Sequence, residues 1–519
     1  MNSDRLAAPA DIPQKSNGRI VSKLMYMIWQ SRKDLQNTFD LHSAEGQSSF
    51  IDWCSVSIGQ EHGGSTEANG ADQQQGNSSS GLIRYQTIMQ MEGVLAKIGT
   101  AMPMGVREFG RRIWKAVVRR LLAHQASRVR VAQTPPTIAT PELADSTPAA
   151  PLGTTGYNLI GHAFAELGMG EHVRMSAASL ATTDVAFGVI NYEHGLLSRK
   201  GAELEHGDVV KENSHKINVF HINADQLLNS YLYYGDRFFS GKYNILYPFW
   251  ELSKWPQQWV SVLDIVDEVW APTKFIEDAM APAIDRPVVH MPVAVTLPET
   301  AGNSRSYFNL PSGRFLFLFT FDSFSFIERK NPFAIVRAFR KAFPLGTEAV
   351  GLVIKSMNAT TSDPRWQDMI NLIGADQRIH VINRTMTRHE LIDLFKVTDC
   401  FVSLHRAEGF GRGPAEAMLL GKPTIVTNYS GNLEFCNDQN SCLVDYRLIP
   451  IEEHQYVMPT GQVWADPDED HAAWYMSKLV NESAYATMVG AQARDYMLKN
   501  FSAEVIGQKY RARLAELGI

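Results

Sequence analysis

From residue 155 onward, short apolar runs alternate with segments of helical pattern. Each run has the length of a strand. Strands that alternate with helices predict parallel sheets with right-handed crossovers, and two successive series predict two doubly wound domains. The predicted strands are 156–161, 185–190, 217–222, 243–249, 268–270 and 288–291 in the first series, and 314–321, 349–355, 378–383, 400–404, 423–427 and 442–444 in the second.

The first third of the chain has a different texture. Residues 59–81 are rich in Gly, Ser, Gln and Asn, and residues 133–155 in Pro, Thr and Ala, which predicts linkers. The apolar spacing over 19–58 suits two short amphipathic helices. The predicted organisation is a small helical accessory module (1–58), linkers (59–155), two Rossmann-like domains (156–300 and 301–490), and C-terminal helices (491–519) that pack back toward the first domain.

Residues 104–124, between the two linkers, form a basic amphipathic pattern. On a helical wheel, one side is basic and the opposite side is mainly apolar. One interpretation is a helix that lies on an anionic membrane surface. The other is a helix that packs on the protein and leaves a solvated charged face. The basic side contains Arg107, Arg111, Arg112, Lys115 and Arg119.

Composition and charge narrow the class of protein. The 519 residues have a formal net charge of -6, which does not suit a nucleic-acid binder. The four cysteines predict a reduced, cytoplasmic protein. We find no pattern of a signal peptide and no run of about 20 apolar residues that would span a membrane. Any contact with a membrane is therefore predicted to be peripheral, on the inner face.

The strongest motif is Glu408-Gly-Phe-Gly-Arg-Gly-Pro-Ala-Glu416, which follows the predicted strand 400–404. Pro414 suits a first helical turn, so Glu408 is predicted in the loop and Glu416 about one turn inside a helix. Glycines let the backbone approach a ligand, and a helix N-terminus offers N–H groups to an anion. The motif predicts a site for an anionic, hydroxyl-rich ligand. A tight glycine turn with two surface glutamates would have the same spacing.

This motif resembles the E-x7-E signature of retaining glycosyltransferases of family 4, which have the GT-B fold of two facing Rossmann-like domains. The likeness covers about residues 155–515, and its motifs are specific in combination. Residues 328–332 resemble the family's phosphate-binding lysine region, and residues 156–171 its first strand and glycine loop. Residues 244–252 and 266–273 resemble a subgroup of bacterial polysaccharide enzymes that includes mannosyltransferases.

The resemblance implies a role for each matching residue. The 156–300 domain would bind the acceptor, and the 301–490 domain the nucleotide sugar. Glu416 would bind the ribose hydroxyls and Glu408 the hydroxyls of the donor sugar, while Lys330 would neutralise the diphosphate. The other residues implied in donor binding are Gly409, Phe410, Gly411, Arg329, Arg384, Met386, Arg406, Gly168 and Gly170.

Two positions depart from the family pattern. The family usually has an arginine five residues before the phosphate lysine, where this chain has Ser325, so Arg329 or Arg406 is the candidate for that charge. Many members carry a histidine near the end of the strand at 243–249; here Glu251 stands close to that place, and His221 ends the preceding strand. Both are candidate catalytic residues, although His221 fits a packed histidine at a strand end equally well.

The resemblance implies retaining transfer of a hexose, with mannose favoured, from a nucleoside-diphosphate sugar such as GDP-mannose. The acceptor would be a saccharide, lipid-linked, in the synthesis of a cell-surface polysaccharide or lipopolysaccharide. The expected partners are the donor, the acceptor and an anionic membrane surface; no nucleic acid, cofactor or metal is expected. The carboxylates of 466–470 are closely spaced, but they precede a helical run and suit its start better than a metal.

Two other functions stay open. A dinucleotide-dependent oxidoreductase would also contain Rossmann-like sheets, but no G-x-G-x-x-G follows the first strand with an acidic residue about 20 positions on. A catalytically weak GT-B scaffold in a polysaccharide assembly complex would keep the fold. Glu408, Glu416 and Lys330 argue against the scaffold, whereas the missing arginine and the long N-terminal extension leave it open.

Overall fold

A computed structural model describes residues 2–15, 19–62, 153–194 and 199–519, so the basic stretch 104–124 lies outside the described residues. The chain divides into two compact units, one of residues 1–14, 20–38 and 150–519, the other of residues 15–19 and 39–149. In the described part of the second unit, helix α4 (Ala44–His62) packs its Phe50 ring against Phe39, with 5.5 Å between centroids.

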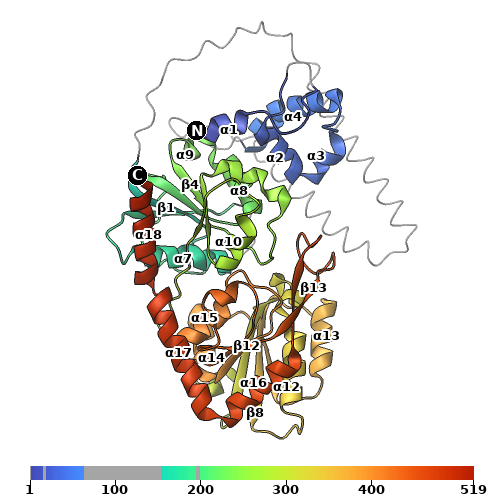
Figure 1. Cartoon of the computed structure of the whole chain (residues 1–519), viewed down its shortest axis with the longest axis vertical. Helices are drawn as coiled ribbons and strands as arrows, with labels where there is room; N and C mark the ends of the chain where they lie inside the picture. The colour runs from blue at the N-terminus through green and yellow to red at the C-terminus, as the bar shows by residue number, and fades with distance from the viewer. Residues whose placement is uncertain (1, 16–18, 63–152, 195–198) are drawn as a thin grey trace, which may run out of the picture. The chain divides into compact units, whose positions relative to one another are not determined.

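Two six-stranded sheets, parallel throughout, form the frame of the first unit (Figure 1). All twelve predicted strands are present, and the two Rossmann-like domains are confirmed. The N-terminal sheet has the order β2-β1-β3-β4-β5-β6, and the C-terminal sheet has the order β12-β11-β10-β7-β8-β9. The strands are β1 (Thr154–Gly161), β2 (Phe187–Asn191), β3 (His215–His221), β4 (Tyr243–Leu246), β5 (Glu268–Ala271), β6 (Val288–His290), β7 (Phe315–Asp322), β8 (Val350–Met357), β9 (Ile379–Asn383), β10 (Cys400–Ser403), β11 (Thr424–Thr427) and β12 (Cys442–Val444).

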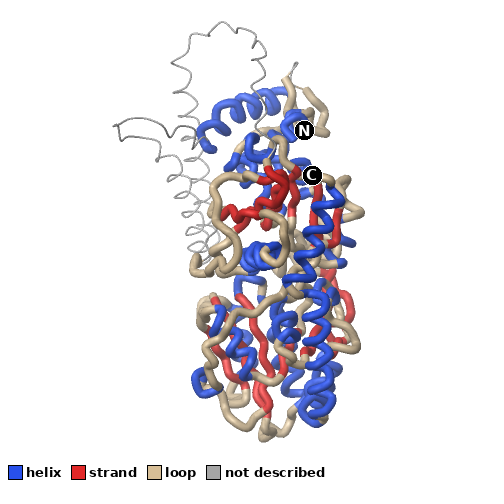
Figure 2. Tube along the Cα trace, turned by 90° about the vertical axis from the view of Figure 1, so that its left-hand side faces the viewer, coloured by secondary structure: helices blue, strands red, loops and turns tan. Residues whose placement is uncertain are grey.

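Helices cover both faces of each sheet, which is why the strands are rich in buried apolar residues. In the C-terminal sheet, Phe317, Phe319 and Phe321 of β7 pack on one face, and Leu316 and Leu318 on the other. In Figure 2 the strands of this sheet lie between helices. The helices of the two domains are α7 (Gly168–Leu180), α8 (Ala224–Tyr234), α9 (Asp236–Phe239), α10 (Lys274–Met280), α11 (Ile327–Lys330), α12 (Pro332–Ala342), α13 (Pro364–Ile373), α14 (Arg388–Val397), α15 (Arg412–Leu419), α16 (Glu469–Asn481), α17 (Ser483–Phe501) and α18 (Ala503–Leu517).

The last two helices connect the domains. Helix α17 packs on α15 of the C-terminal domain, and α18 packs on α7 of the N-terminal domain (Figure 1). Tyr510 of α18 is buried against Tyr157 and Trp270, and its carbonyl accepts a 2.8 Å hydrogen bond from the Tyr157 hydroxyl. The N-terminal sheet is therefore covered on one side by a helix more than 200 residues downstream.

Some elements differ from the prediction. The segment 19–58 begins three helices instead of two, because Arg32 adopts an extended conformation that separates α2 (Lys23–Ser31) from α3 (Lys33–Thr38) before α4 begins. A further helix, α1 (Asn2–Ala7), precedes them. The sequence pattern also missed an antiparallel hairpin of β13 (Tyr446–Pro450) and β14 (Val463–Pro467), whose first strand is largely exposed and has no core-facing alternation.

The strand order marks where a ligand site belongs. In the C-terminal sheet, β7 pairs directly with β10, and the chain order reverses between them. In the N-terminal sheet the reversal lies between β1 and β3. Sheets of this kind bind ligands outside the carboxyl ends of the strands at such a reversal. A ligand site is therefore expected at the loops that follow β7 and β10 and at those that follow β1 and β3.

The contact of α18 with the N-terminal sheet can be tested at Glu268, whose side chain is fully buried. Arg513 of α18 donates to both carboxylate oxygens, one bond being 3.1 Å long. We expect Arg513→Met to lower the free energy of unfolding by about 3 kcal/mol, because it leaves a buried carboxylate without a cation. Urea unfolding followed by far-UV circular dichroism measures the change.

The matched control is Arg511→Met on the same helix. Arg511 pairs with Asp184 at 3.1 Å, but both side chains are more than half exposed, and exposed pairs contribute about 0–1 kcal/mol. Equal losses in the two variants would show that the Glu268 pair does not hold α18 in place.

Candidate active site

The loops after β7 and β10 bring a lysine and an arginine onto one carboxylate. Lys330 donates from Nζ to Oε1 of Glu408, and Arg329 donates from Nη1 to Oε2 at 3.0 Å. Lys330 is the last residue of α11, and Asn331, with φ of 52°, begins α12 as its N-cap. The Asn331 amide also donates to the Leu404 carbonyl at 3.0 Å, which joins the loop after β7 to the end of β10.

Burial and charge compete at Glu408. Burial alone would raise the pKa of Glu408, but Lys330 and Arg329 outweigh it and lower this pKa to about 2. At Lys330, burial lowers the pKa and the Glu408 charge only partly restores it. We take the ion pair as the state near neutral pH, since Lys330 and Arg329 both hold Glu408 as a carboxylate. Glu408 is therefore a hydrogen-bond acceptor and not a proton donor.

Glu251 joins this cluster from the N-terminal domain. Its Oε1 lies 4.0 Å from Nη2 of Arg329, and its Oε2 accepts a 2.7 Å hydrogen bond from the hydroxyl of Tyr456. Tyr456 lies in the loop of the β13–β14 hairpin, and the Arg329 guanidinium stands 5.7 Å from its ring centroid. Four predicted site residues, Glu408, Lys330, Arg329 and Glu251, therefore meet in one place.

His221 lies in a different environment. It is fully buried, its Nε2 is 2.8 Å from the Ser176 hydroxyl, and burial lowers its pKa to about 3. Its ring packs against His172 and Tyr247. These are the contacts of a packed neutral histidine, and none of them involves Glu408 or Lys330. His172 is also buried, and neither of its ring nitrogens has a hydrogen-bond partner.

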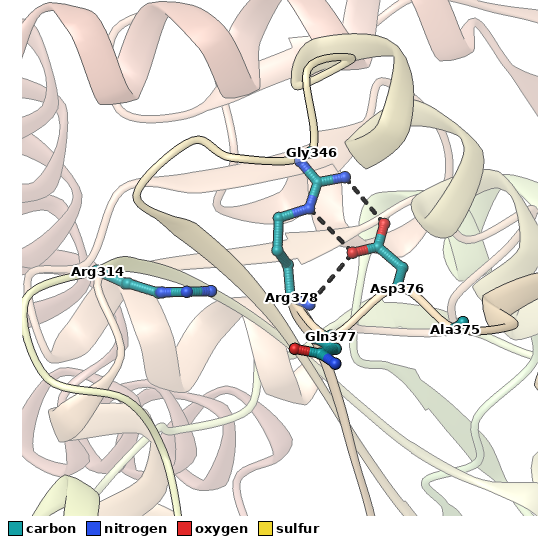
Figure 3. Close-up of a pocket in the computed structure, with 6 residues that line it drawn as sticks. All are labelled: Arg314, Gly346, Ala375, Asp376, Gln377 and Arg378. Carbon is teal, nitrogen blue, oxygen red and sulfur yellow. Dashed lines mark hydrogen bonds and ion pairs between the residues drawn. The ribbon is translucent and has the colours of Figure 1, made fainter.

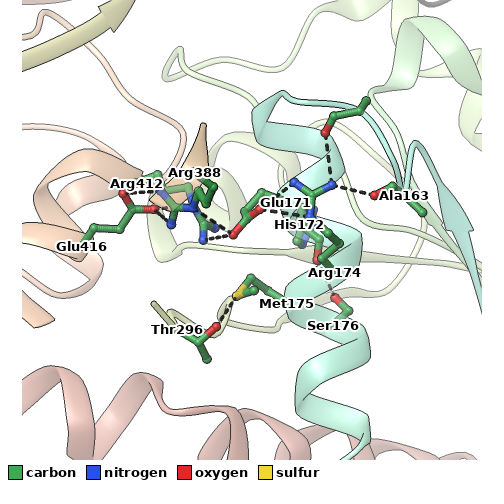
Figure 4. A network of polar contacts seen from close by, with 11 residues as sticks. Ala163, Glu171, His172, Arg174, Met175, Ser176, Thr296, Arg388, Arg412 and Glu416 are labelled. Atoms are coloured by element: carbon green, nitrogen blue, oxygen red, sulfur yellow. Dashed lines mark hydrogen bonds and ion pairs between the residues drawn. The ribbon is translucent and has the colours of Figure 1, made fainter. Parts of the chain in front are cut away.

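Glu416 lies inside α15 and is held by two arginines (Figure 4). Arg388 donates to both of its carboxylate oxygens, one bond being 3.0 Å long, and Nε of Arg412 lies 2.7 Å from Oε1. Arg412 then crosses to the N-terminal domain, where its Nη2 donates to Glu171 at 2.7 Å, and Arg174 donates to the same carboxylate at 2.6 Å. The side chains of Glu408 and Glu416 are 12% and 3% exposed. The motif is therefore not a turn with two surface glutamates.

Backbone geometry explains the glycines of the motif. Gly411 has φ of +94° and is the N-cap of α15. A Cβ at Gly409 would lie 3.2 Å from the Trp250 carbonyl, and the Gly409 carbonyl accepts a 3.1 Å bond from the Thr273 hydroxyl. A Cβ at Gly170 would lie 2.3 Å from the Ala165 carbonyl. The loop of the motif thus approaches the N-terminal domain closely, and its conformation depends on glycine.

The remaining predicted donor-binding residues have other contacts. Arg384 pairs with Glu390 at 3.0 Å and is 43% exposed, and Met386 is buried in the core beneath α14. Arg406 packs over Trp464 and lies 3.5 Å from Asp466. Phe410 is buried against Phe435 and Phe501, and Gly168 is the first residue of α7. Their roles in donor binding stay predictions.

The carboxylates of the acidic segment 466–470 have different contacts and do not converge on one point. Asp466 pairs with Arg447 at 2.9 Å, Glu469 pairs with Arg337 at 2.6 Å, and Asp468 is the N-cap of α16. Among the described residues, no group of three metal-ligating side chains comes together. All four cysteines are free and buried.

A cavity of about 370 Å³ lies at the other end of the C-terminal sheet (Figure 3). It is bordered by residues that precede β7, β8 and β9, and its Arg378 is already paired with Asp376 and Glu348. Ligands of doubly wound sheets bind at the carboxyl ends of the strands, so this cavity is not the candidate site. Its lining residues are Arg314, Gly346, Ala375, Asp376, Gln377 and Arg378.

Four residues of the site were not predicted as members: Glu171, Arg388, Arg412 and Tyr456. Arg412 lies inside the glycine motif, and a cation in the first turn of a helix opposes the helix dipole, which is a signal that could have found it. Arg388 repeats that signal at the start of α14. Tyr456 lies in a hairpin loop whose sequence has no periodic pattern, so only the fold brings it to Glu251.

Comparisons with known proteins agree with this geometry. Residues 323–496, which include Lys330, Glu408 and Glu416, match the family model described as "Glycosyl transferases group 1". A sucrose-phosphate synthase from Thermosynechococcus elongatus superimposes with a TM-score of 0.52 at 14% identity, over 70% of this chain and 99% of that one. HepE from Anabaena, in complex with UDP and glucose, superimposes with a TM-score of 0.50 at 13% identity, over 70% and 100%.

At these identities the two structures establish the fold, which is GT-B. Together with the family match, the fold supports a glycosyltransferase. A search of the curated proteins found no match to the sequence. Of the helices in the part of the chain that the structure describes, none combines the length and the apolar character needed to cross a bilayer.

The ion pairs of Glu171 with Arg412, Arg388 and Arg174 predict that the free energy of unfolding depends on pH. Burial would raise the pKa of Glu171, but Arg412, Arg388 and Arg174 lower it to about 2. The stabilisation is therefore complete above the unfolded pKa of about 4.3 and is lost as the pH falls toward 2. We expect Glu171→Gln to lower the free energy of unfolding by about 3 kcal/mol at pH 7, and this difference from wild type to shrink steadily from pH 5 to pH 3. Urea unfolding at each pH measures it.

Glu166→Gln is the control, since Glu166 pairs with Arg199, which is 64% exposed. The Glu166→Gln substitution should lower the free energy of unfolding by less than about 1 kcal/mol. A difference between wild type and Glu171→Gln that stays constant from pH 7 to pH 3 would contradict the assignment.

Proposed function

We propose that this chain is a retaining glycosyltransferase that moves a hexose, with mannose favoured, from a nucleoside-diphosphate sugar to a saccharide acceptor. The observation that carries the proposal is the cluster of Glu408, Lys330 and Arg329 at the carboxyl ends of β7 and β10. It combines a fixed carboxylate, which accepts from sugar hydroxyls, with a cation suited to a departing phosphate.

The mechanism follows from the charge that develops during transfer. As the bond between the sugar and the diphosphate breaks, the phosphate gains negative charge and the sugar becomes positive. Lys330 and the N–H groups at the start of α15 would stabilise the phosphate. Glu408, kept ionised by its two cations, would orient the sugar through its hydroxyls. Attack by the acceptor on the face that the phosphate leaves, with the phosphate taking the acceptor's proton, would retain the anomeric configuration without a protein nucleophile.

The donor and the acceptor have different support. HepE, which shares the fold, is in complex with UDP and glucose, and this supports a nucleoside-diphosphate donor as a class. The preference for GDP-mannose rests on the polysaccharide-enzyme resemblance of residues 244–252 and 266–273. A lipid-linked acceptor rests on the basic stretch 104–124.

The first experiment is a titration of the purified chain with GDP, UDP, dTDP and ADP, followed by thermal shift and calorimetry. We expect one nucleotide to bind and to raise the melting temperature, because a ligand of the folded state stabilises it. Lys330→Gln should weaken that binding about tenfold or more, since it removes one charged contact to the phosphates. The control is Lys341→Gln, at the far end of α12, where the lysine is 43% exposed.

Two further results decide the details. If no nucleotide binds to the folded wild type at millimolar concentration, the catalytic proposal fails and the scaffold takes its place. If transfer occurs, NMR of the first product tells the anomer: a product of inverted configuration would rule out the retaining mechanism. We use Lys330 in place of Glu416 because a substitution of Glu416 would leave Glu171 as the one carboxylate facing both Arg388 and Arg412.

Membrane binding is tested separately. If residues 104–124 lie on anionic lipid, the chain should sediment with vesicles of anionic lipid and not with neutral vesicles, and salt should weaken the binding. Arg111→Glu with Arg112→Glu should reduce the bound fraction several-fold. Unchanged sedimentation of this variant would remove the membrane from the proposal and leave nucleotide binding untouched.

A further inference from the structure

Four arginines around the motif have an unsatisfied donor. Nε of Arg329, Arg388, Arg406 and Arg412 is buried and has no hydrogen-bond partner; among the described arginines, only Arg286, in the N-terminal domain, shares this property. Buried polar groups are almost always hydrogen-bonded, so several orphans in one place need a reason. Nε of Arg412 is close to Glu416, but its N–H does not point at that oxygen.

Arg388 and Arg412 are also placed against a local rule. Arg388 is the first residue of α14, and Arg412 is the first residue of α15. A cation at the N-terminus of a helix meets the positive end of the dipole, whereas an anion is favoured there. Local rules are broken where function requires it. Two helix N-termini that each carry an arginine and converge on one carboxylate form a strongly electropositive place.

The cluster of arginines and glutamates around Glu171 and Glu416 has an excess of positive charge, which favours binding of an anion. Arg174, Arg388 and Arg412 face Glu171 and Glu416, so cations exceed anions by one (Figure 4). Arg388 is 28% exposed and Arg412 23%, so both remain reachable from solvent. Arg329, by contrast, is 6% exposed and already bound to Glu408, and Arg406 packs on Trp464. Arg329 and Arg406, the candidates from the sequence for the charge missing at Ser325, are therefore less available to a ligand.

We propose that Arg388 and Arg412 bind the diphosphate of the donor and supply the charge for which this chain has Ser325 in place of an arginine. The inference rests on the proposed function. A guanidinium matches two phosphate oxygens at once and would give the orphaned Nε donors acceptors. Because Arg388 occupies both oxygens of Glu416, it leaves this carboxylate when it turns to the diphosphate. Glu416 is then free to accept from the ribose hydroxyls.

The test compares ligands that differ only in phosphate. Calorimetry with GDP, GMP and guanosine, and with UDP, UMP and uridine, is performed on the full chain as wild type, Arg388→Lys and Arg412→Lys. Lysine keeps the charge beside Glu416 and Glu171 but lacks the planar fork. In both variants we expect diphosphate affinity to fall tenfold or more, monophosphate affinity to fall less, and nucleoside affinity to stay within twofold. Arg447→Lys, on an 80% exposed arginine of the hairpin, is the control and should change nothing.

Each result of these titrations either supports or overturns the assignment of Arg388 and Arg412 to the diphosphate. Wild-type diphosphate affinity in folded Arg388→Lys and Arg412→Lys overturns the inference while the proposed function stands. An equal loss for nucleoside and diphosphate also overturns it, because the arginines then shape the base or ribose site. Absence of nucleotide binding by wild type is the separate failure of the proposed function. If Arg412→Lys does not fold, as its thermal transition will show, Arg388→Lys decides alone.

Discussion

Glu408 is a carboxylate in the protein interior, and its position depends on the direct pairing of β7 with β10. The pairing brings Lys330 and Arg329 to Glu408 from segments almost 80 residues apart. A buried charge without a partner costs several kcal/mol, whereas a paired one with further hydrogen bonds is tolerated. The crossover topology of the sheet therefore determines where a buried carboxylate can find its cations in this chain. The site lies at the reversal of strand order because the two connecting loops meet only there.

The second carboxylate of the motif follows the same constraint on a larger scale. Glu416 is held by Arg388 and Arg412, and Arg412 reaches Glu171 in the other domain. The loop between the two glutamates lies against the N-terminal domain through the Gly409 carbonyl and the Thr273 hydroxyl. Both charged clusters therefore include side chains of both domains. A ligand that changes the charge around Glu408 or Glu416 therefore also changes the electrostatic attraction between the two domains.

The sequence predicted the strands well because the central ones are buried on both faces, so that short apolar runs such as those of β7 and β10 stand out between the helical segments. It predicted Glu408 and Lys330 through motifs that lie within a few residues of a strand end. It did not predict the pairing of Glu416 with Arg388, because that contact depends on how α14 and α15 approach each other. Tyr456 and its hairpin were missed for a related reason: β13 is exposed, so burial imposes no pattern on it. The candidates Arg384 and Met386 show the reverse case, in which proximity in sequence to a strand end did not bring the residue to the cluster.

The contact of α18 with the N-terminal sheet also has a consequence for synthesis. The sheet is complete in sequence at β6, yet Glu268 has no cation until Arg513 emerges from the ribosome. At about 5–20 residues per second, the intervening segment takes on the order of 10–40 s to translate. During that time the Glu268 carboxylate has the hydrogen bonds from Tyr243 and Trp270 but no cation, and the face later covered by Tyr510 is bare. The N-terminal domain therefore completes its packing only after α18 has been synthesised.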